Sequence, residues 1–227
     1  MDWVLANSEL LWRLALDHVA LSAPPIVLGF ALSLPIGWAA NRYRFSRGAL
    51  LSIAGILYAI PSLPLFFVMP LILGTRILDP ANVVVALTIY AVALMVRTVA
   101  DGLAATPGEV RRSATALGFS AWRRFWQVDL PLAGPVLLAG LRVVSVSTVS
   151  LVTVGAVIGV NSLGYLFLDG YYRFFPLEVA IGIVLTLVVA LVFDGILVLA
   201  GRLLMPWART SRAPGRRALA TREAAAR

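Results

Sequence analysis

Arg142 and Asp194 are the residues whose types and positions most need a chemical explanation, because each is the one charge within a long apolar run. A charge inside a lipid bilayer is costly unless it is paired or solvated. Two opposite charges could pair between helices, which lowers the cost of both, or they could contact a polar substrate. We favour the structural pair over the substrate contact.

Residue types that usually carry catalysis or bind metals are scarce in this chain. It has no Cys and one His, His18, and all nineteen of its basic residues are Arg. The usual Cys/His zinc sites and a standard Walker A site, which needs Lys, therefore cannot be built. A Gly-x-Ser-x-Gly stretch is also missing, which disfavours an intramembrane enzyme. We expect no catalytic residue, metal or cofactor, and any ATP must be bound by another subunit.

Composition indicates that most of this chain lies in a lipid bilayer. Apolar residues make up 60% of 227 residues and charged residues 13%, and the mean hydropathy is +0.91. A helix needs about 20 apolar residues to cross the hydrocarbon core. Five segments approach or exceed that length, namely residues 19–40, 49–74, 80–96, 130–160 and 179–201. We predict an all-α integral membrane protein with five transmembrane helices.

The arginines between these segments predict the orientation. Segments 41–48 and 97–129 hold three and five arginines, and the tail from residue 202 holds seven, all on one side of the predicted membrane. The opposite side holds three, so the positive-inside rule places the N-terminus outside and the C-terminus in the cytosol. We interpret the net charge of +8 as a sign that the arginines contact the anionic membrane surface and not nucleic acid. Residues 1–205 form the predicted transmembrane domain, and 206–227 a basic, disordered cytosolic tail.

The segment between the third and fourth predicted helices is too long for a simple connection. Thr106-Pro107-Gly108-Glu109 fits a capping box, with Pro107 at the first helical position and Glu109 reaching back to the cap. Gly118 is placed to end this helix with positive φ, Ser120 to cap a second short helix, and Pro131 to open the fourth span. Composition leaves two interpretations open, a docking surface for a partner protein and an amphipathic helix lying on the membrane.

This loop resembles a known motif. Ser113-Ala114-Thr115-Ala116-Leu117-Gly118, nine further residues and Val128-Asp129-Leu130-Pro131 are similar to the EAA motif of ABC importer permeases, which reads Glu-Ala-Ala, three residues, Gly, nine residues, Ile-x-Leu-Pro. Arg112 stands at the position of the motif glutamate and Ser113 at that of its first alanine. The resemblance implies a cytosolic coupling helix that docks on an ATPase. The residues concerned are Glu109, Arg112, Ser113, Ala114, Leu117, Gly118, Val128, Leu130 and Pro131.

Four further stretches resemble the osmoprotectant type of these permeases, and the likeness extends over most of residues 20–205. They are Ile60-Pro61-Ser62-Leu63, Leu87-Thr88-Ile89-Tyr90-Ala91 (leading to Arg97), Ala139-Gly140-Leu141-Arg142 and Ile158-Gly159-Val160-Asn161-Ser162-Leu163-Gly164. The resemblance implies a multi-pass permease of the bacterial inner membrane that translocates glycine betaine, choline, carnitine or proline betaine. Its implied partners are ABC ATPase subunits, a second permease subunit, identical or paralogous, and an extracytoplasmic solute-binding protein. A permease for methionine or another small amino acid is the alternative.

Two regions remain open between a functional and a structural interpretation. Candidates for the translocation path are Tyr58, Pro61, Ser62, Tyr90, Arg142 and Asp194. A quaternary ammonium group suits aromatic faces, but these aromatic residues could equally pack against lipid or neighbouring helices. The aromatic-rich outer segment 161–178 fits either a docking surface for the binding protein or an aromatic belt at the membrane interface.

Overall fold

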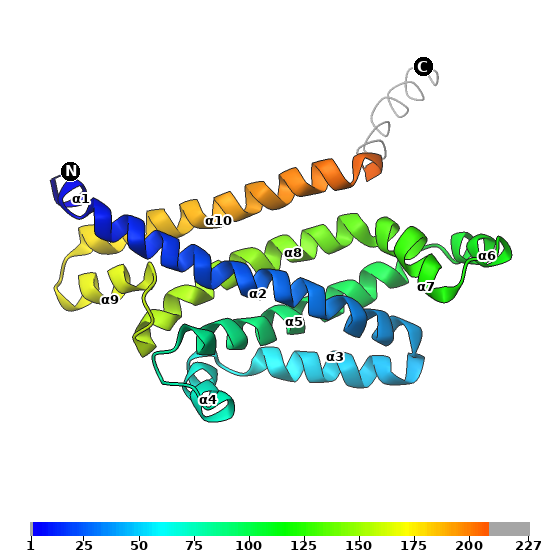
Figure 1. Cartoon of the computed structure of the whole chain (residues 1–227), viewed down its shortest axis with the longest axis horizontal. Helices are drawn as coiled ribbons and strands as arrows, with labels where there is room; N and C mark the ends of the chain where they lie inside the picture. Colours follow the sequence, from blue (N-terminus) through cyan, green and yellow to red (C-terminus); the bar gives the residue numbers. More distant parts are fainter. Residues whose placement is uncertain (1, 209–227) are drawn as a thin grey trace, which may run out of the picture.

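The structure is a computed structural model that describes residues 2–208, so the predicted tail lies outside the described residues from position 209 onward. The described chain contains helices and no strand (Figure 1). The helices are α1 (Asp2–Ala6), α2 (Ser8–Arg42), α3 (Arg44–Ala59), α4 (Ser62–Leu73), α5 (Pro80–Ala104), α6 (Gly108–Ala116), α7 (Ala121–Arg124), the π-helix η1 (Phe125–Asp129), α8 (Leu130–Val152), the 3-10 helix η2 (Thr153–Ile158), α9 (Gly164–Tyr172) and α10 (Pro176–Leu204). The prediction of an all-α protein is confirmed.

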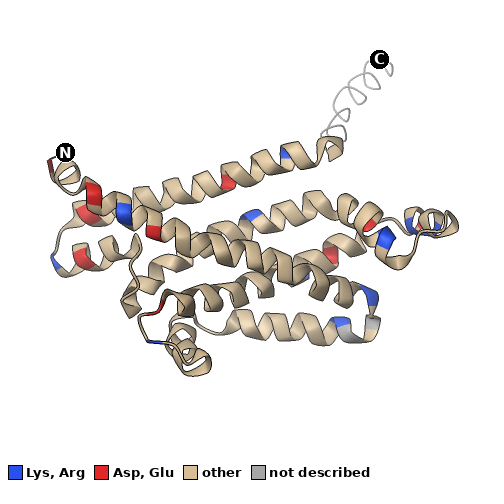
Figure 2. Ribbon diagram, viewed as in Figure 1, with Lys and Arg blue, Asp and Glu red and all other residues tan. Residues whose placement is uncertain are grey.

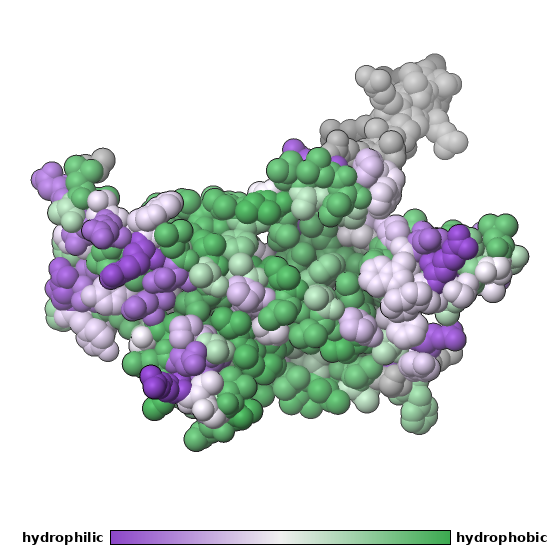
Figure 3. All heavy atoms as spheres, viewed as in Figure 1, coloured by the Kyte–Doolittle hydropathy of each residue, from purple (hydrophilic) through white to green (hydrophobic). Residues whose placement is uncertain are grey.

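Four helical segments are long and apolar enough to cross a membrane: α2, α5, the continuous stretch Ala121–Ile158, and α10. A fifth span exists if the bent pair α3 and α4 is counted as one. The structure thus supports four or five spans. Charged residues gather toward the two ends of the bundle in Figure 2, and the surface between these ends is largely apolar in Figure 3.

The second predicted span is broken in two. A bend of 103° separates α3 from α4, whereas the apolar run 49–74 predicted one bent span. Pro61 disfavours the helical conformation for the residue before it, and Ile60 is accordingly extended, with φ −65° and ψ 129°. Pro61 then serves as the N-cap of α4. Proline therefore ends one helix and starts the next here.

The helices also extend beyond the apolar runs that predicted them. The helix of the first predicted span, α2, begins at Ser8 instead of residue 19, and α5 continues to Ala104, so that Arg97 lies inside a helix and not in the loop. Hydropathy marks the part of a helix that contacts lipid, whereas caps and breakers set its ends. At the start of α5, Asp79 accepts a hydrogen bond from the Ala81 N–H, at 2.9 Å, beside Pro80 in the first turn.

The central helix of the bundle is α5, which packs against α2, α3, α4 and α8. Gly29 and Gly37 of α2 allow the closest approach, because an added Cβ would lie 2.3 Å from Ala91 Cβ and 2.5 Å from Val99 Cβ. Small residues at helix contacts are typical of packing within membranes. In contrast, only four of the 29 residues of α10 are buried, and many of its apolar side chains are exposed.

Candidate functional site

The predicted loop is a defined structure at the end of the bundle opposite the N-terminus (Figure 1). Gly118 has φ +81°, as predicted. Its N–H donates to the Thr115 carbonyl at 3.0 Å, and the Phe119 N–H donates to the Ala114 carbonyl at 3.1 Å. This pair of hydrogen bonds is the Schellman motif, which satisfies the last carbonyls of α6 and turns the chain sharply.

The predicted capping box at the start of α6 is wrong. Pro107, with φ −57° and ψ 134°, is the N-cap and not the first helical residue, and no side chain caps the helix. Thr106 therefore lies one residue too early; its hydroxyl is buried without a hydrogen-bond partner among the described residues. Glu109 is exposed in the first turn, where a negative charge interacts favourably with the helix dipole.

Asp129 anchors the loop to the bundle. Arg111 Nε donates to Asp129 Oδ1 at 2.9 Å, and Arg124 Nε lies 3.5 Å from Oδ2. Arg111 Nη2 also donates to the Leu103 carbonyl, which ties α6 to the end of α5. The Asp129 side chain is only 9% exposed, so this carboxylate is a nearly buried anion between two cations. Sequence reasoning missed its role, although Asp129 is the only acidic residue between Glu109 and Asp169.

Polar and aromatic contacts fix the second half of the loop. Arg124 Nη1 donates to Thr115 Oγ1 at 3.0 Å, and Thr115 Oγ1 donates to the Arg111 carbonyl at 2.8 Å. Ser120 accepts a hydrogen bond from the Arg123 N–H at 3.3 Å, which confirms the predicted cap of α7. Phe125 is buried and packs edge-on against Trp38 of α2, with ring centroids 6.2 Å apart.

Pro131 does not open a new helix, contrary to prediction. The chain is helical from Ala121 onward, and Pro131 lies in the first turn of α8 directly after η1. Pro131 has no N–H to donate to the helix. Directly before it the hydrogen bonds follow the wider π-helical pattern, in which the Leu130 N–H donates to the carbonyl five residues earlier, that of Phe125. Val128, Leu130 and Pro131 are thus half-buried residues of one continuous helix.

The outer surface of the loop consists of the remaining motif residues. Arg112, Ser113, Ala116, Leu117 and Gly118 are exposed, and Leu117 is 78% exposed. Ala114, by contrast, is buried against the rest of the loop. A large apolar side chain held at the tip of a fixed turn is suited to insertion into a pocket of another protein.

Four of the path candidates meet at the break between α3 and α4. The Tyr58 and Tyr90 rings pack edge-on with centroids 5.9 Å apart, and the Tyr90 hydroxyl donates to the Ile60 carbonyl. In a continuous helix this carbonyl would accept from residue 64, but Pro64 has no N–H. Tyr90 therefore satisfies the acceptor that the prolines leave free, and Pro61 and Ser62 lie beside it.

The other two candidates form a separate cluster. Arg142 of α8 donates from Nε to Asp194 Oδ1 at 2.5 Å and from Nη2 to Oδ2 at 2.8 Å, so the predicted interhelical pair exists. The pair lines an open pocket between α8 and α10 together with Ala139, Val143, Val146 and Ser147. It shares neither a pocket nor a contact with the tyrosine cluster in the part of the chain described.

A test of the Arg142–Asp194 pair compares single and double replacements. We expect Asp194→Asn to lower the stability of the folded chain, but by less than a fully buried pair would lose, because the Arg142 side chain is 45% exposed. The double variant R142Q/D194N leaves no unpaired charge and should be more stable than D194N. Thermal unfolding of detergent-purified protein measures both, and equal stabilities would contradict a structural pairing.

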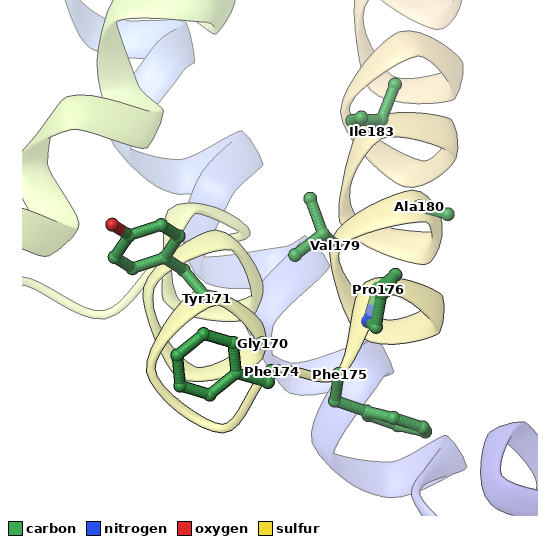
Figure 4. A pocket seen from close by; sticks show the side chains of 8 residues that line it. All are labelled: Gly170, Tyr171, Phe174, Phe175, Pro176, Val179, Ala180 and Ile183. Atoms are coloured by element: carbon green, nitrogen blue, oxygen red, sulfur yellow. The ribbon is translucent and has the colours of Figure 1, made fainter.

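The opposite end of the bundle carries the aromatic-rich segment that includes α9. Arg173 Nη1 lies 2.7 Å from Asp169 Oδ2 and 3.7 Å from Glu178 Oε2. Figure 4 shows a pocket to which Tyr171 contributes from the end of α9, Phe174 from the turn after it, and Val179 and Ile183 from α10. Tyr171, Tyr172 and Phe174 are strongly exposed. This arrangement fits a protein-docking surface and an interfacial aromatic belt equally well.

Comparison with known proteins gives the following similarities. Residues 26–205 match the family model of binding-protein-dependent transport system inner membrane components. The glycine betaine/carnitine/choline transport system permease protein OpuCB of Bacillus subtilis is 28% identical over 201 residues, and the choline transport system permease protein OpuBB of the same species 30%, each match covering 88% of this chain and 90% of the relative. The inward-facing MetNI methionine ABC transporter shares the fold, with a TM-score of 0.73 at 20% identity, over 85% of this chain and 96% of that chain.

Proposed function

Because this chain belongs to the family of binding-protein-dependent transport system inner membrane components, we propose that it forms the membrane path of an importer for quaternary-ammonium compatible solutes. The chain is the permease subunit of an ABC importer in the inner membrane, and ATP is hydrolysed by a separate chain. Relatives named for choline and for glycine betaine, carnitine and choline support the substrate class. Tyr58, which is 46% exposed and packs on the buried Tyr90, adds an aromatic surface of the kind that attracts such cations.

The observation that carries the coupling role is the anchored loop of residues 106–131. Asp129 fixes its base to the bundle through Arg111 and Arg124, whereas Leu117 and Gly118 are presented outward on a rigid turn. A rigid element transmits a push from an ATPase to the helices with which it is continuous, here α5 and α8. The ATPases bind this loop in the cytosol, and closure of the ATPase pair switches the path from outward- to inward-facing.

Three further features complete the proposed assembly. The orientation is N-terminus outside and C-terminus inside, as the arginine distribution predicts. A second permease subunit, identical or paralogous, covers part of the apolar surface that α10 leaves exposed. The solute-binding protein docks at the end that carries α9, where Tyr171, Tyr172 and Phe174 project from the surface.

Because the chain has no cysteine, a single introduced cysteine tests the docking directly. Ala116→Cys places a thiol on the exposed face of α6, and Tyr172→Cys places one at the opposite end as the matched control. We expect a thiol-directed crosslinker to join A116C, and not Y172C, to the ATPase subunit in native membranes. A membrane-impermeant maleimide should label Y172C in whole cells and A116C only in inside-out vesicles. Failure of A116C to capture the ATPase would contradict the docking role.

Uptake measurements test the substrate class. Expressed with its binding protein and ATPase in cells that lack other osmolyte importers, the wild-type chain should support accumulation of radiolabelled glycine betaine, carnitine or choline. Growth at high osmolarity should recover when one of these solutes is supplied. Accumulation of methionine without any quaternary-ammonium solute would instead favour an amino-acid permease.

A further inference from the structure

Arg97 is an unpaired charge on the most enclosed helix of the bundle. From Asn82 to Leu103 of α5, only Arg97 and Asp101 are exposed, and every other residue is buried or half-buried. Asp101 is paired with Arg47 of α3 at 2.7 Å, but Arg97 has no hydrogen bond or ion pair with any described residue. Arg97 is therefore exposed one helical turn further from the end of α5 than Asp101.

The contacts between α3 and α5 locate the exposed Arg97 on the side of α5 that faces α3. The two helices run antiparallel, because Arg47 contacts Asp101 at one end and Tyr58 contacts Tyr90 at the other. Arg97 lies between these two contacts on the same side of α5. The residues of α3 and α8 include no acidic side chain, and α2, whose Gly37 packs against Val99 of α5, has none after Asp17. The three helices that flank this part of α5 thus provide no anion for Arg97.

Arg97 and Tyr90 share one face of α5. They are seven residues apart, which is close to two helical turns and about 10 Å along the axis. The Cα–Cβ bond of a helical residue tilts toward the helix N-terminus, so the Arg97 side chain starts in the direction of Tyr90. Tyr90 itself is buried, and the exposed Tyr58 of α3 packs against it. The aromatic surface of Tyr58, suited to a cation, and the guanidinium of Arg97, suited to an anion, therefore follow one another along the contact between α3 and α5.

We propose that Arg97 binds the carboxylate of zwitterionic quaternary-ammonium solutes as they move along the α3–α5 face past Tyr58 and Tyr90. This inference rests on the proposed function and adds to it a residue that distinguishes between substrates. Glycine betaine and carnitine carry a carboxylate, whereas choline carries the same trimethylammonium group with a hydroxyl in place of the carboxylate. A guanidinium that binds the carboxylate in a charge-assisted hydrogen bond acts on the first two solutes and not on the third.

The test is the ratio of glycine betaine uptake to choline uptake in one cell line expressing the complete importer. We expect Arg97→Gln to lower this ratio about tenfold or more, because it removes a charge-assisted hydrogen bond that only the carboxylate-bearing solute can make. Arg97→Lys keeps the positive charge and should restore part of the ratio. The matched control is Arg13→Gln, which removes an exposed arginine from α2 far from this face and should leave the ratio at the wild-type value.

Each outcome decides between the alternatives. An equal loss of both uptakes in R97Q would overturn the proposal, because a bound lipid phosphate or a general structural role of Arg97 does not depend on the solute. Unchanged uptake of both solutes would overturn it as well.

If the wild-type importer takes up only carboxylate-bearing solutes, the proposal requires R97Q to lose an uptake that R97K retains. Absence of all quaternary-ammonium uptake in the wild type would refute the proposed function itself. The ratio is independent of the amount of protein in the membrane.

Discussion

Replacing Gly118 with valine is expected to lower solute uptake about tenfold or more while the protein still accumulates in the membrane. Gly118 has φ +81°, a conformation that costs a residue with a Cβ about 1–2 kcal/mol and a β-branched residue more. An added Cβ would meet nothing within 4 Å, so the effect comes from the backbone and not from a clash. The strain would undo the Schellman turn and move Leu117 away from its fixed position at the loop tip. Radiolabelled uptake and immunoblotting of membranes measure the two expectations.

Two further variants separate this explanation from a general intolerance of larger side chains. Asparagine adopts positive φ more readily than other residues with a side chain, so Gly118→Asn should retain most of the uptake. Gly48 of α3 also has open space around its added Cβ but lies within a helix, so Gly48→Val should leave uptake near the wild-type level. A wild-type rate in G118V, or an equal loss in G118N and G118V, would contradict a requirement for the left-handed turn.

Patterns with a local physical cause were predictable from the sequence. A helix that must turn sharply after Leu117 favours glycine at the next position, and an exposed helix start favours serine at position 120; the structure has both features. Residues 49–74 were predicted to bend at their prolines, but sequence could not give the size of the bend. That size depends on Tyr90, thirty residues away, whose hydroxyl satisfies the Ile60 carbonyl.

Contacts between residues far apart in the sequence were predicted only where few partners of opposite charge were available. Arg142 and Asp194 are each alone in an apolar run, so an interhelical pair was the simplest way to lower the cost of both. Arg97 was assigned to the loop because the apolar run before it ends there, although α5 continues for seven more residues. Its lack of a partner became visible only once the packing around α5 was known.

The loop and the path share the central helix, which gives coupling a physical basis. At its C-terminal end, α5 is held to α6 through the hydrogen bond from Arg111 to the Leu103 carbonyl. Near its middle, Tyr90 holds the carbonyl at the α3–α4 break. Movement of the loop would therefore be transmitted along α5 to the aromatic pair, provided that the base of the loop remains fixed to the bundle.

Replacing Asp129 with asparagine should break that attachment. The change leaves Arg111 and Arg124 without their anion in a site where the Asp129 side chain is only 9% exposed. Removing one partner of a buried ion pair costs about 3–5 kcal/mol, and the partial exposure of the two arginines, 27% and 21%, reduces this to about 2 kcal/mol. We expect uptake to fall about tenfold or more and the ATPase of the reconstituted importer to respond less to the solute-loaded binding protein. Faster trypsin cleavage within residues 111–124 in inside-out vesicles should report the loosened loop.

The matched control is Asp101→Asn, which removes the acidic partner from another arginine–aspartate pair at the same end of the bundle. Asp101 contacts Arg47 at 2.7 Å, but its side chain is 55% exposed, so the pair contributes less than about 1 kcal/mol. D101N should therefore keep most of the uptake and the wild-type rate of trypsin cleavage. If D129N resembled D101N in both measurements, the loop would not depend on Asp129 for its attachment. A loosened loop must expose the bonds after Arg111 and Arg124 to trypsin. A loss of uptake in D129N without faster cleavage would therefore show that Asp129 has a role other than anchoring the loop.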